Sequence, residues 1–420
     1  MAEGLDGGRL SSSAGGGPLP GSERAVVLDV LRGLALLGVL VANVALIAAP
    51  ARETALSALD DAHPLDAAAE VVVAVLVTGK FYPLLALLFG VGLALQLGRP
   101  DGVRLVGRRL SVLLVIGLAH ALLVWTGDIL IVYALLGALV VAGFRRRSSG
   151  TLARWAIVLL AGPALFASGA VTGAELARVA LPAFDAEMAA EDADATARIR
   201  REAARLRTVY GDGSYADTLA DRVTTTPAAV AGGVGLGLLS VLPAMLLGVI
   251  LVRHGLPAGL PARSPLLRRV RRWGLRVGLP SNVAAVTALY LLGPRADAGL
   301  LLGVLPFAGS VLALGYGATV ALAVLDRSWA ARLMPLAPVG RLALTNYLLG
   351  SVVATTIFSG YGLGLYDRVG AATQVVLALL LFALQVLLSG WWVRRFRFGP
   401  AEWLWRSATY GRRQPFRLAR

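Results

Sequence analysis

About ten apolar stretches, each long enough to cross a lipid bilayer, shape what this 420-residue chain can fold into. Hydrophobic residues make up 57% of the sequence and charged residues 15%, whereas a soluble domain is about 45–50% apolar. The sequence therefore predicts an all-α fold, a polytopic transmembrane helix bundle. The predicted spans are 26–49, 79–97, 110–125, 128–144, 154–175, 228–252, 274–293, 299–325, 337–358 and 371–393.

An even number of spans places both termini on one side of the membrane. The loops on that side are rich in arginine, as in 98–109, 145–153 and 253–273, and so is the tail from residue 394. The loops on the other side carry few arginines. Because cytoplasmic loops of membrane proteins are enriched in Lys and Arg, both termini are predicted to be cytoplasmic.

Changes in composition divide the chain into segments. Residues 1–23 are rich in Gly, Ser and Pro, which predicts a disordered cytoplasmic tail. Residues 24–410 form the predicted transmembrane helical domain, and 411–420 form a basic cytoplasmic tail. The long mixed-charge segment 176–227 is then extracytoplasmic, and its helical spacing predicts one or two surface helices that cap the outer face.

The charged and sulfur-containing residues exclude several classes of site. The chain has no cysteine, which excludes disulfides and Cys-ligated metals. Its three histidines, His63, His120 and His254, are widely separated, so no metal site is expected. A net charge of +15 would suggest nucleic-acid binding in a soluble protein, but here the arginines orient the helices, and no nucleic-acid partner is expected.

Three polar residues form a stripe along the first span. Asp29, Arg32 and Asn43 fall within about 60° of one another around a helix, with Asn43 about 16 Å beyond Arg32. Ionisable groups inside a membrane indicate function by default. Alternatively, Asp29 and Arg32 form an ion pair at the helix end, and Asn43 bonds a neighbouring helix.

The stretch GLAHALLVWTGDIL, residues 117–130, places two polar side chains in an apolar hairpin. Asp128 is explained by the need for an N-cap at the start of the next helix. His120 lies two helical turns below the hairpin tip and needs a polar partner if it is buried. A histidine beside an acid is typical of a general base, of a proton relay or of an interhelical hydrogen bond, and the sequence leaves these alternatives open.

Lys80 is the only lysine in a chain with 40 basic residues. Either its site requires a compact amine that can lose a proton, or its survival is chance. Residues 66–78 are predicted to form a short interfacial piece that breaks from the following span around Gly79 and Lys80. The predicted topology puts Lys80, Asn43, His120 and Asp128 at a similar depth toward the outer face.

Two stretches near the C-terminus place further polar groups at the cytoplasmic side. In VGRLALTNYLLG, residues 339–350, Arg341 begins the ninth span and Asn346 lies deeper. In RRFRFGPAEWLWR, residues 394–406, arginines alternate with aromatic residues, a pattern typical of a membrane interface. We expect this second stretch to form a cytoplasmic lid or interface helix.

Six blocks of sequence together resemble the YeiB family of bacterial multipass membrane proteins. They are LDVLRGLALLGVLVAN, GKFYPLLALLFGVGL, GLAHALLVWTGDILIVYALLG, YGDGSYADTLADR, GRLALTNYLLGS and FGPAEWLWR. The first block also resembles the opening helix of the transmembrane acyltransferases related to heparan glucosaminide acetyltransferase. Asp29, Arg32 and Asn43 match the motif D-x-x-R-G…N of that enzyme. Its catalytic histidine has no clean counterpart here, which moves the expected base to His120.

The resemblance implies an acyltransferase in the bacterial plasma membrane that takes an acyl group from cytosolic acyl-CoA. The acceptor would be a small molecule or glycan of the cell envelope. Arg32 and Arg341, with Asp29 and Asn346 nearby, would bind the donor, because arginine suits bidentate contact with phosphate.

In the same reading, His120 oriented by Asp128 would deprotonate the acceptor, and Asn43 or Lys80 would stabilise the oxyanion. The alternative is a proton-coupled transporter or exporter of a small molecule. Its permeation path would be the polar stripe of the first span, and its proton relay would be His120 and Asp128.

Overall fold

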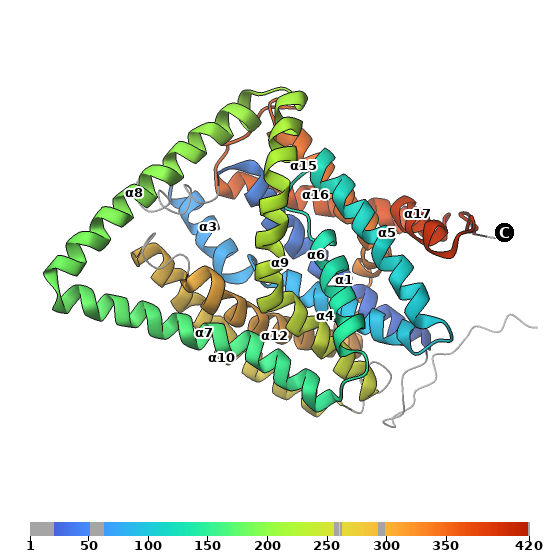
Figure 1. Cartoon of the computed structure of the whole chain (residues 1–420). Helices are drawn as coiled ribbons and strands as arrows, with labels where there is room; N and C mark the ends of the chain where they lie inside the picture. The colour runs from blue at the N-terminus through green and yellow to red at the C-terminus, as the bar shows by residue number, and fades with distance from the viewer. Residues whose placement is uncertain (1–20, 51–62, 256–259, 261–262, 293–298, 419–420) are drawn as a thin grey trace, which may run out of the picture.

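The chain folds as a bundle of helices (Figure 1). The computed structural model describes residues 21–50, 63–255, 260, 263–292 and 299–418, and within them the β pairing is one isolated bridge, between Phe396 and Arg417. The α-helices are α1 (Gly21–Ala48), α3 (Pro64–Leu76), α4 (Phe81–Leu97), α5 (Gly102–Leu123), α6 (Leu130–Leu139), α7 (Ser149–Ala180), α8 (Pro182–Leu206), α9 (Tyr215–Arg253), α10 (Ser264–Leu292), α12 (Leu305–Leu325), α13 (Arg327–Leu333), α14 (Leu336–Arg341), α15 (Ala343–Phe358), α16 (Ala371–Trp392) and α17 (Pro400–Tyr410). Shorter π-helical segments are η1 (Val140–Phe144), η2 (Arg207–Asp212) and η4 (Leu300–Val304).

The helices confirm the predicted polytopic bundle. Within the described residues, 8 helices are long and apolar enough to cross a membrane. Two shorter apolar helices, Leu130–Phe144 and Ala343–Phe358, correspond to the remaining predicted spans. Several helices extend past the predicted limits: α9 begins at Tyr215 rather than 228, and α10 begins at Ser264 rather than 274. Hydropathy locates the apolar centre of a helix, whereas the polar turns that continue it leave no such signal.

The second apolar segment is broken where the sequence predicted. Helix α3 ends at Leu76 and α4 begins at Phe81. Gly79 between them has a φ of +80°, a left-handed conformation that residues with a side chain rarely adopt. Helix α3 then packs against α16 and α10.

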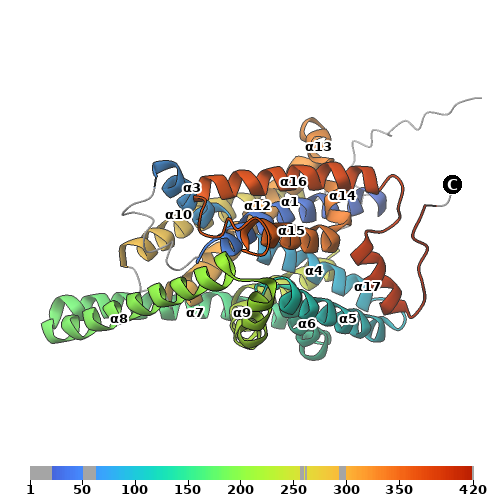
Figure 2. The same ribbon diagram turned by 90° about the horizontal axis from the view of Figure 1, so that it is seen from above.

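Helix α1 runs through the centre of the bundle and α7 along its edge (Figures 1 and 2). In the apolar 18-residue stretch that makes each helix a candidate span, 72% of α1 is buried inside the protein, against 17% of α7. Helix α1 packs against α4, α14, α15 and α16. A central helix surrounded by protein is a suitable scaffold for polar side chains, because its neighbours can supply their hydrogen-bond partners.

The contact between α1 and α14 depends on two glycines. A Cβ atom at Gly340 would collide with the backbone carbonyl of Asp29, and one at Gly33 would collide with that of Leu336. This close approach brings Arg341, the last residue of α14, beside the first half of α1. The predicted ninth span, 337–358, is thus divided at Leu342 into α14 and α15.

Helix α8 lies across one end of the bundle, between the end of α7 and the start of α9 (Figure 1). It is the charged surface helix that the segment 176–227 predicted. Arg178 of α7 is 8% exposed and pairs with Asp185 and Asp192 of α8. The predicted disordered tail falls almost wholly outside the described residues, which begin at 21, and the side of the membrane that α8 faces remains a prediction.

Candidate functional site

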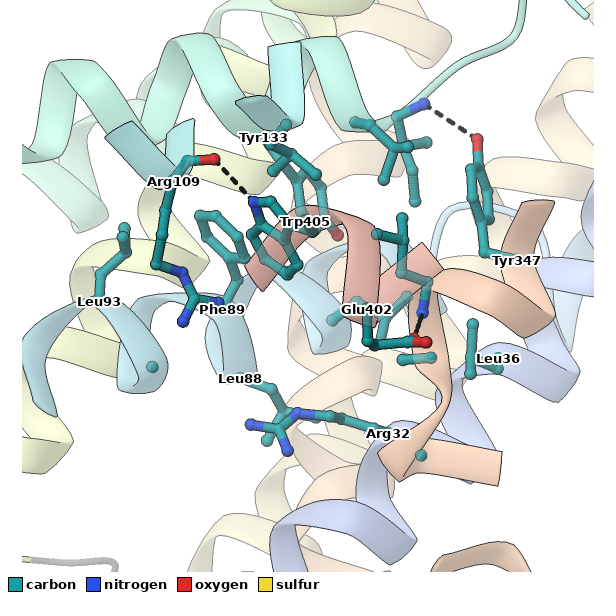
Figure 3. A pocket seen from close by; sticks show the side chains of 18 of the residues that line it. Arg32, Leu36, Leu88, Phe89, Leu93, Arg109, Tyr133, Tyr347, Glu402 and Trp405 are labelled. Carbon is teal, nitrogen blue, oxygen red and sulfur yellow. Dashed lines mark hydrogen bonds between the residues drawn. The ribbon is translucent and has the colours of Figure 1, made fainter. Parts of the chain in front are cut away.

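A cavity of about 350 Å³ opens at the end of the bundle opposite α8. Helices α1, α4, α5, α6, α14, α15 and α17 contribute to its wall. In Figure 3, Arg32 and Arg109 lie at one side of the cavity and Tyr347 at the other. Its polar lining residues are Arg32, Gln96, Arg109, Tyr133, Arg341, Tyr347, Glu402, Trp405 and Arg406, and leucines, Phe89 and Ile129 form most of the rest.

Four arginines line this cavity: Arg32, Arg109, Arg341 and Arg406. The part of the cavity that they line is called the arginine end below. Arg32 pairs with Asp29 at 2.7 Å. Within the part of the chain that the structure describes, the other three form no direct ion pair, and Arg341 interacts with Asp29 at longer range. The guanidinium groups of Arg32 and Arg406 are close enough to that of Arg109 for electrostatic interaction. A cleft in which cations outnumber carboxylates attracts anions.

Helix α17 closes one side of the cavity, as the expected lid or interface helix. The guanidinium of Arg109 lies 4.3 Å from the ring centroid of Trp405, a cation–π contact. The indole N–H of Trp405 donates to the backbone carbonyl of Arg109 at 2.8 Å. These contacts fix α17 against α5 and hold Arg406 beside the cavity.

Glu402 of α17 caps the start of α15. Its carboxylate accepts the backbone N–H groups of Leu344 at 2.7 Å and Thr345 at 3.0 Å, and it also accepts the Thr345 hydroxyl at 2.5 Å. Burial raises the pKa of the Glu402 carboxyl, and the bonds from Thr345 and Leu344 partly oppose that rise. The oxygens of Glu402 therefore satisfy the free N–H groups at the start of α15.

His120 and Asp128 form the pair that the hairpin predicted. The two side chains meet at 2.7 Å, between Nδ1 of His120 and Oδ2 of Asp128, and the residues are 3% and 8% exposed. Asp128 Oδ1 accepts the backbone N–H of Ile131 at 2.8 Å, as expected of a residue that caps α6. Within the described residues, His120 Nε2 has no hydrogen-bond partner. A carboxylate that accepts Nδ1–H leaves Nε2 as the basic nitrogen.

Tyr347 connects this pair to the cavity. Its ring centroid is 5.2 Å from that of His120, and its hydroxyl lies 3.5 Å from Asp128 Oδ2. The same hydroxyl accepts the backbone N–H of Ile129 at 3.2 Å, as Figure 3 shows. Tyr347 lines the cavity, whereas His120 and Asp128 lie behind it.

The structure places Asn43 and Asn346 next to a separate, smaller cavity of about 10 Å³, on the other side of Tyr347. Asn43 Oδ1 accepts the Tyr82 hydroxyl at 2.6 Å. The Asn346 side chain donates to the Ser389 hydroxyl at 2.9 Å, which joins α15 to α16. Both amides therefore make interhelical bonds, which for Asn43 is the alternative role that the sequence left open.

Lys80 lies apart from the His120 pair, although the two share a predicted depth. It is 1% exposed, and its ammonium donates to the Ala74 carbonyl at 2.6 Å. No contact in the described part of the chain joins Lys80 to His120. The lateral position of a helix in the bundle decides such contacts, and the topology gives only the depth.

Sequence reasoning missed Arg109, Arg406, Trp405 and Tyr347. The sequence predicts that Arg109 belongs to a cytoplasmic loop and Arg406 to a membrane-interface helix. The two are far apart in the sequence, so nothing in it indicates that they meet. The available signal was positional: Arg109 directly precedes the third predicted span, and Tyr347 follows Asn346. Within the described residues, no three His, Asp or Glu side chains are close enough to hold a metal ion.

Comparison with known proteins identifies relatives along nearly the whole chain. A family model described as "Protein of unknown function (DUF418)" matches residues 251–412, which include Arg341, Tyr347 and Glu402. Uncharacterized protein YxaH of Bacillus subtilis (strain 168) is 32% identical over 416 residues, covering 94% of this chain and 96% of that protein. Uncharacterized protein YeiB of Escherichia coli (strain K12) is 31% identical over 396 residues, covering 92% and 96%.

A third relative is an uncharacterized 39.9 kDa protein from the amylase 3' region of Bacillus acidopullulyticus. It is 28% identical over 407 residues, covering 96% of this chain and 98% of that protein. No solved structure matches the chain significantly. Two relatives above 30% identity, matched over nine-tenths of their length, agree with the six sequence blocks: the chain belongs to the YeiB family of multipass membrane proteins.

Proposed function

We propose that this protein is an acyltransferase of the bacterial plasma membrane, which moves an acyl group from cytosolic acyl-CoA to an acceptor in the cell envelope. The observation that carries the proposal is the cavity. Four arginines line its arginine end, and Tyr347 separates its other end, the inner end, from the buried His120–Asp128 pair. A donor for this cavity must be anionic at one end and reactive at the other. Acyl-CoA has its phosphates and its thioester at opposite ends.

The arginine end suits the phosphates of CoA. Arg32 and Arg341 come from α1 and α14, and Arg109 and Arg406 come from α5 and α17, so four different helices supply the cations. Arginine binds phosphate through two parallel N–H donors. The apolar wall beyond, formed by residues such as Leu36, suits the less polar pantetheine arm. This end is also the predicted cytoplasmic end, where acyl-CoA is found.

The inner end suits acyl transfer. Asp128 orients His120 so that Nε2 is basic and can take a proton from the acceptor hydroxyl or amine. The acceptor oxygen or nitrogen then attacks the thioester carbonyl, the C–S bond breaks, and the proton passes from His120 to the departing thiolate. Asn43, held by Tyr82, and Lys80 were the predicted oxyanion donors; Asn43 is the nearer candidate, because it lies across Tyr347 from the cavity.

Thermal unfolding of the detergent-solubilised protein tests the donor site. A ligand at about 100 times its Kd stabilises the folded state by about 2.7 kcal/mol. We expect acetyl-CoA and the unreactive analogue desulfo-CoA to raise Tm, and we expect Arg32→Ala to reduce the shift. Arg268→Ala, which removes an arginine of α10 outside the cavity, is the matched control and should keep the shift.

Absence of any Tm shift at millimolar CoA ester would overturn the proposal. The alternative, a proton-coupled transporter, would then be tested by uptake into vesicles with an imposed pH gradient. A shift that survives in Arg32→Ala but is lost in Arg268→Ala would place the donor site on α10 and contradict the cavity as its location.

A further inference from the structure

Two tyrosines line the cavity, Tyr133 and Tyr347. The Tyr133 hydroxyl donates to the backbone carbonyl of Tyr82 at 2.6 Å, so its proton is already used within the protein. Of the two, Tyr347 is therefore the hydroxyl that can offer a proton to a ligand.

The surroundings of Tyr347 hold its oxygen in place, and its hydroxyl donates only a long hydrogen bond. The Ile129 N–H donates to this oxygen at 3.2 Å. The acceptor nearest to the proton is Asp128 Oδ2, at 3.5 Å, the upper limit of a hydrogen bond. That carboxylate already has closer donors, His120 at 2.7 Å and the Ile131 N–H at 2.8 Å. Loss of the long contact costs the carboxylate little, so the Tyr347 proton is available to another acceptor.

The same side chain also separates the donor from the base. Tyr347 contributes to the wall of the cavity, and its ring lies against that of His120, with centroids 5.2 Å apart. A thioester at this end of the cavity therefore meets Tyr347 before it meets His120. The carbonyl oxygen then lies beside a phenol, and the carbonyl carbon lies toward the general base.

We infer that Tyr347 is a catalytic residue whose hydroxyl donates a hydrogen bond to the thioester carbonyl oxygen and stabilises the oxyanion during acyl transfer. This inference rests on the proposed function and adds a residue that the sequence analysis did not select. Tyr347 keeps its proton throughout. The acceptor's proton goes to His120 Nε2 and then to the thiolate of CoA when the C–S bond breaks, so the step needs no further reactant.

The absence of cysteine makes the reaction easy to follow. A thiol-reactive dye is added to the purified protein in vesicles of E. coli polar lipid, with acetyl-CoA as donor and an envelope extract as acceptor. The protein itself does not react with the dye, and subtraction of a blank without protein leaves the signal of released CoA thiol. We compare wild type with Tyr347→Phe, which removes the hydroxyl and keeps the ring. Removal of one oxyanion donor lowers kcat by about 10²- to 10³-fold, and the Kd for desulfo-CoA should stay within about twofold, because that analogue has no carbonyl to bond.

Tyr316→Phe is the matched control. The Tyr316 hydroxyl donates to the Leu76 carbonyl at 3.1 Å, and Tyr316 does not line the cavity. This variant should keep the wild-type kcat. If Tyr347→Phe is unstable, 3-fluorotyrosine at position 347 gives a second test, because it keeps the hydroxyl as a stronger donor and should preserve turnover.

The possible outcomes separate this inference from the proposed function. Wild-type release of thiol with an unchanged kcat in Tyr347→Phe overturns the role of Tyr347 and leaves the acyltransferase standing. A fall in desulfo-CoA affinity without a fall in kcat also overturns it, because Tyr347 would then serve donor binding alone. Failure of the wild type to bind desulfo-CoA and to release thiol overturns both.

Discussion

The arginines at the two ends of the bundle differ in how many acidic partners they have. At the end crossed by α8, arginines are paired with acids: Arg205 with Glu202 and Asp221, Arg207 with Asp367, and Arg368 with Asp212. At the cavity end, Asp29 pairs directly with Arg32 and interacts with Arg341 at longer range, and Arg109, Arg341 and Arg406 form no direct ion pair in the described part of the chain. Paired charges hold a fold together, whereas a group of unpaired like charges destabilises it unless an anion binds. The difference supports the proposal that the cavity end binds an anionic ligand.

The largest expected effect comes from the residue that lies between the two ends. His120→Ala should lower kcat for thiol release from acetyl-CoA by about 10²- to 10⁴-fold, the usual contribution of a general base. The shift of Tm with desulfo-CoA should remain, because the arginine end is intact. His254→Ala, at the exposed end of α9, is the control. Normal turnover in His120→Ala would show that the base is another residue.

Arg341→Ala should weaken donor binding and leave the fold in place. Loss of a hydrogen-bonded contact to a charged group costs about 1.5–3 kcal/mol, so KM for acetyl-CoA should rise about 10- to 100-fold with little change in kcat. Arg368→Ala removes an arginine from the opposite end and should leave KM unchanged. Equal effects of the two variants on KM would contradict the distinction between the ends.

Asp221→Asn should lower the stability of the fold and leave donor binding unchanged, the reverse of Arg341→Ala. Asp221 accepts from Arg205 and from the Tyr210 hydroxyl at 2.8 Å, and its side chain is 7% exposed. Loss of its charge should lower the free energy of unfolding by about 1–3 kcal/mol, with no change in the affinity for desulfo-CoA. Denaturation of the detergent-solubilised variant, followed by tryptophan fluorescence, measures the free energy of unfolding. Calorimetric titration measures the affinity for desulfo-CoA.

The smallest effect concerns Glu402 and depends on pH. Its folded-state pKa is raised above the ordinary value of 4.5, so its contribution to stability is largest below pH 4.5 and is lost as the pH rises through the folded-state pKa. Glu402→Gln keeps an acceptor for the start of α15 without a charge. The Tm of the wild type should fall relative to that of Glu402→Gln as the pH increases, and the opposite slope would show that capping bonds outweigh burial.

The sequence predicted the features that depend on local pattern. Span length and hydropathy predicted the helices, Gly79 predicted the break before α4, and the short turn between α5 and α6 allowed His120 and Asp128 to meet. Arg32 and Arg341 were also selected, and both line the cavity. These features follow from residues that are close in sequence or from the depth that the topology assigns.

What the sequence did not predict depends on which helices are neighbours. Arg109 and Arg406 come close because α17 packs on α5. Tyr347 reaches from α15 to the ring of His120 and the carboxylate of Asp128. Lys80 and His120 share a predicted depth, yet α3 and α12 surround Lys80. Which helices pack together in a membrane bundle depends on close contacts at small residues, such as Gly340 against α1. The sequence of one span does not show which other span it packs against.

The position of α17 has a consequence for how the protein is made. Glu402, Trp405 and Arg406 come after the last span, yet they contact α15 and α5 and complete the cavity wall. During synthesis, the whole membrane domain must therefore be inserted before the wall can close. A chain truncated before residue 400 would have its spans but an open cavity and a bare start of α15, so a helix made after these spans completes the proposed donor site.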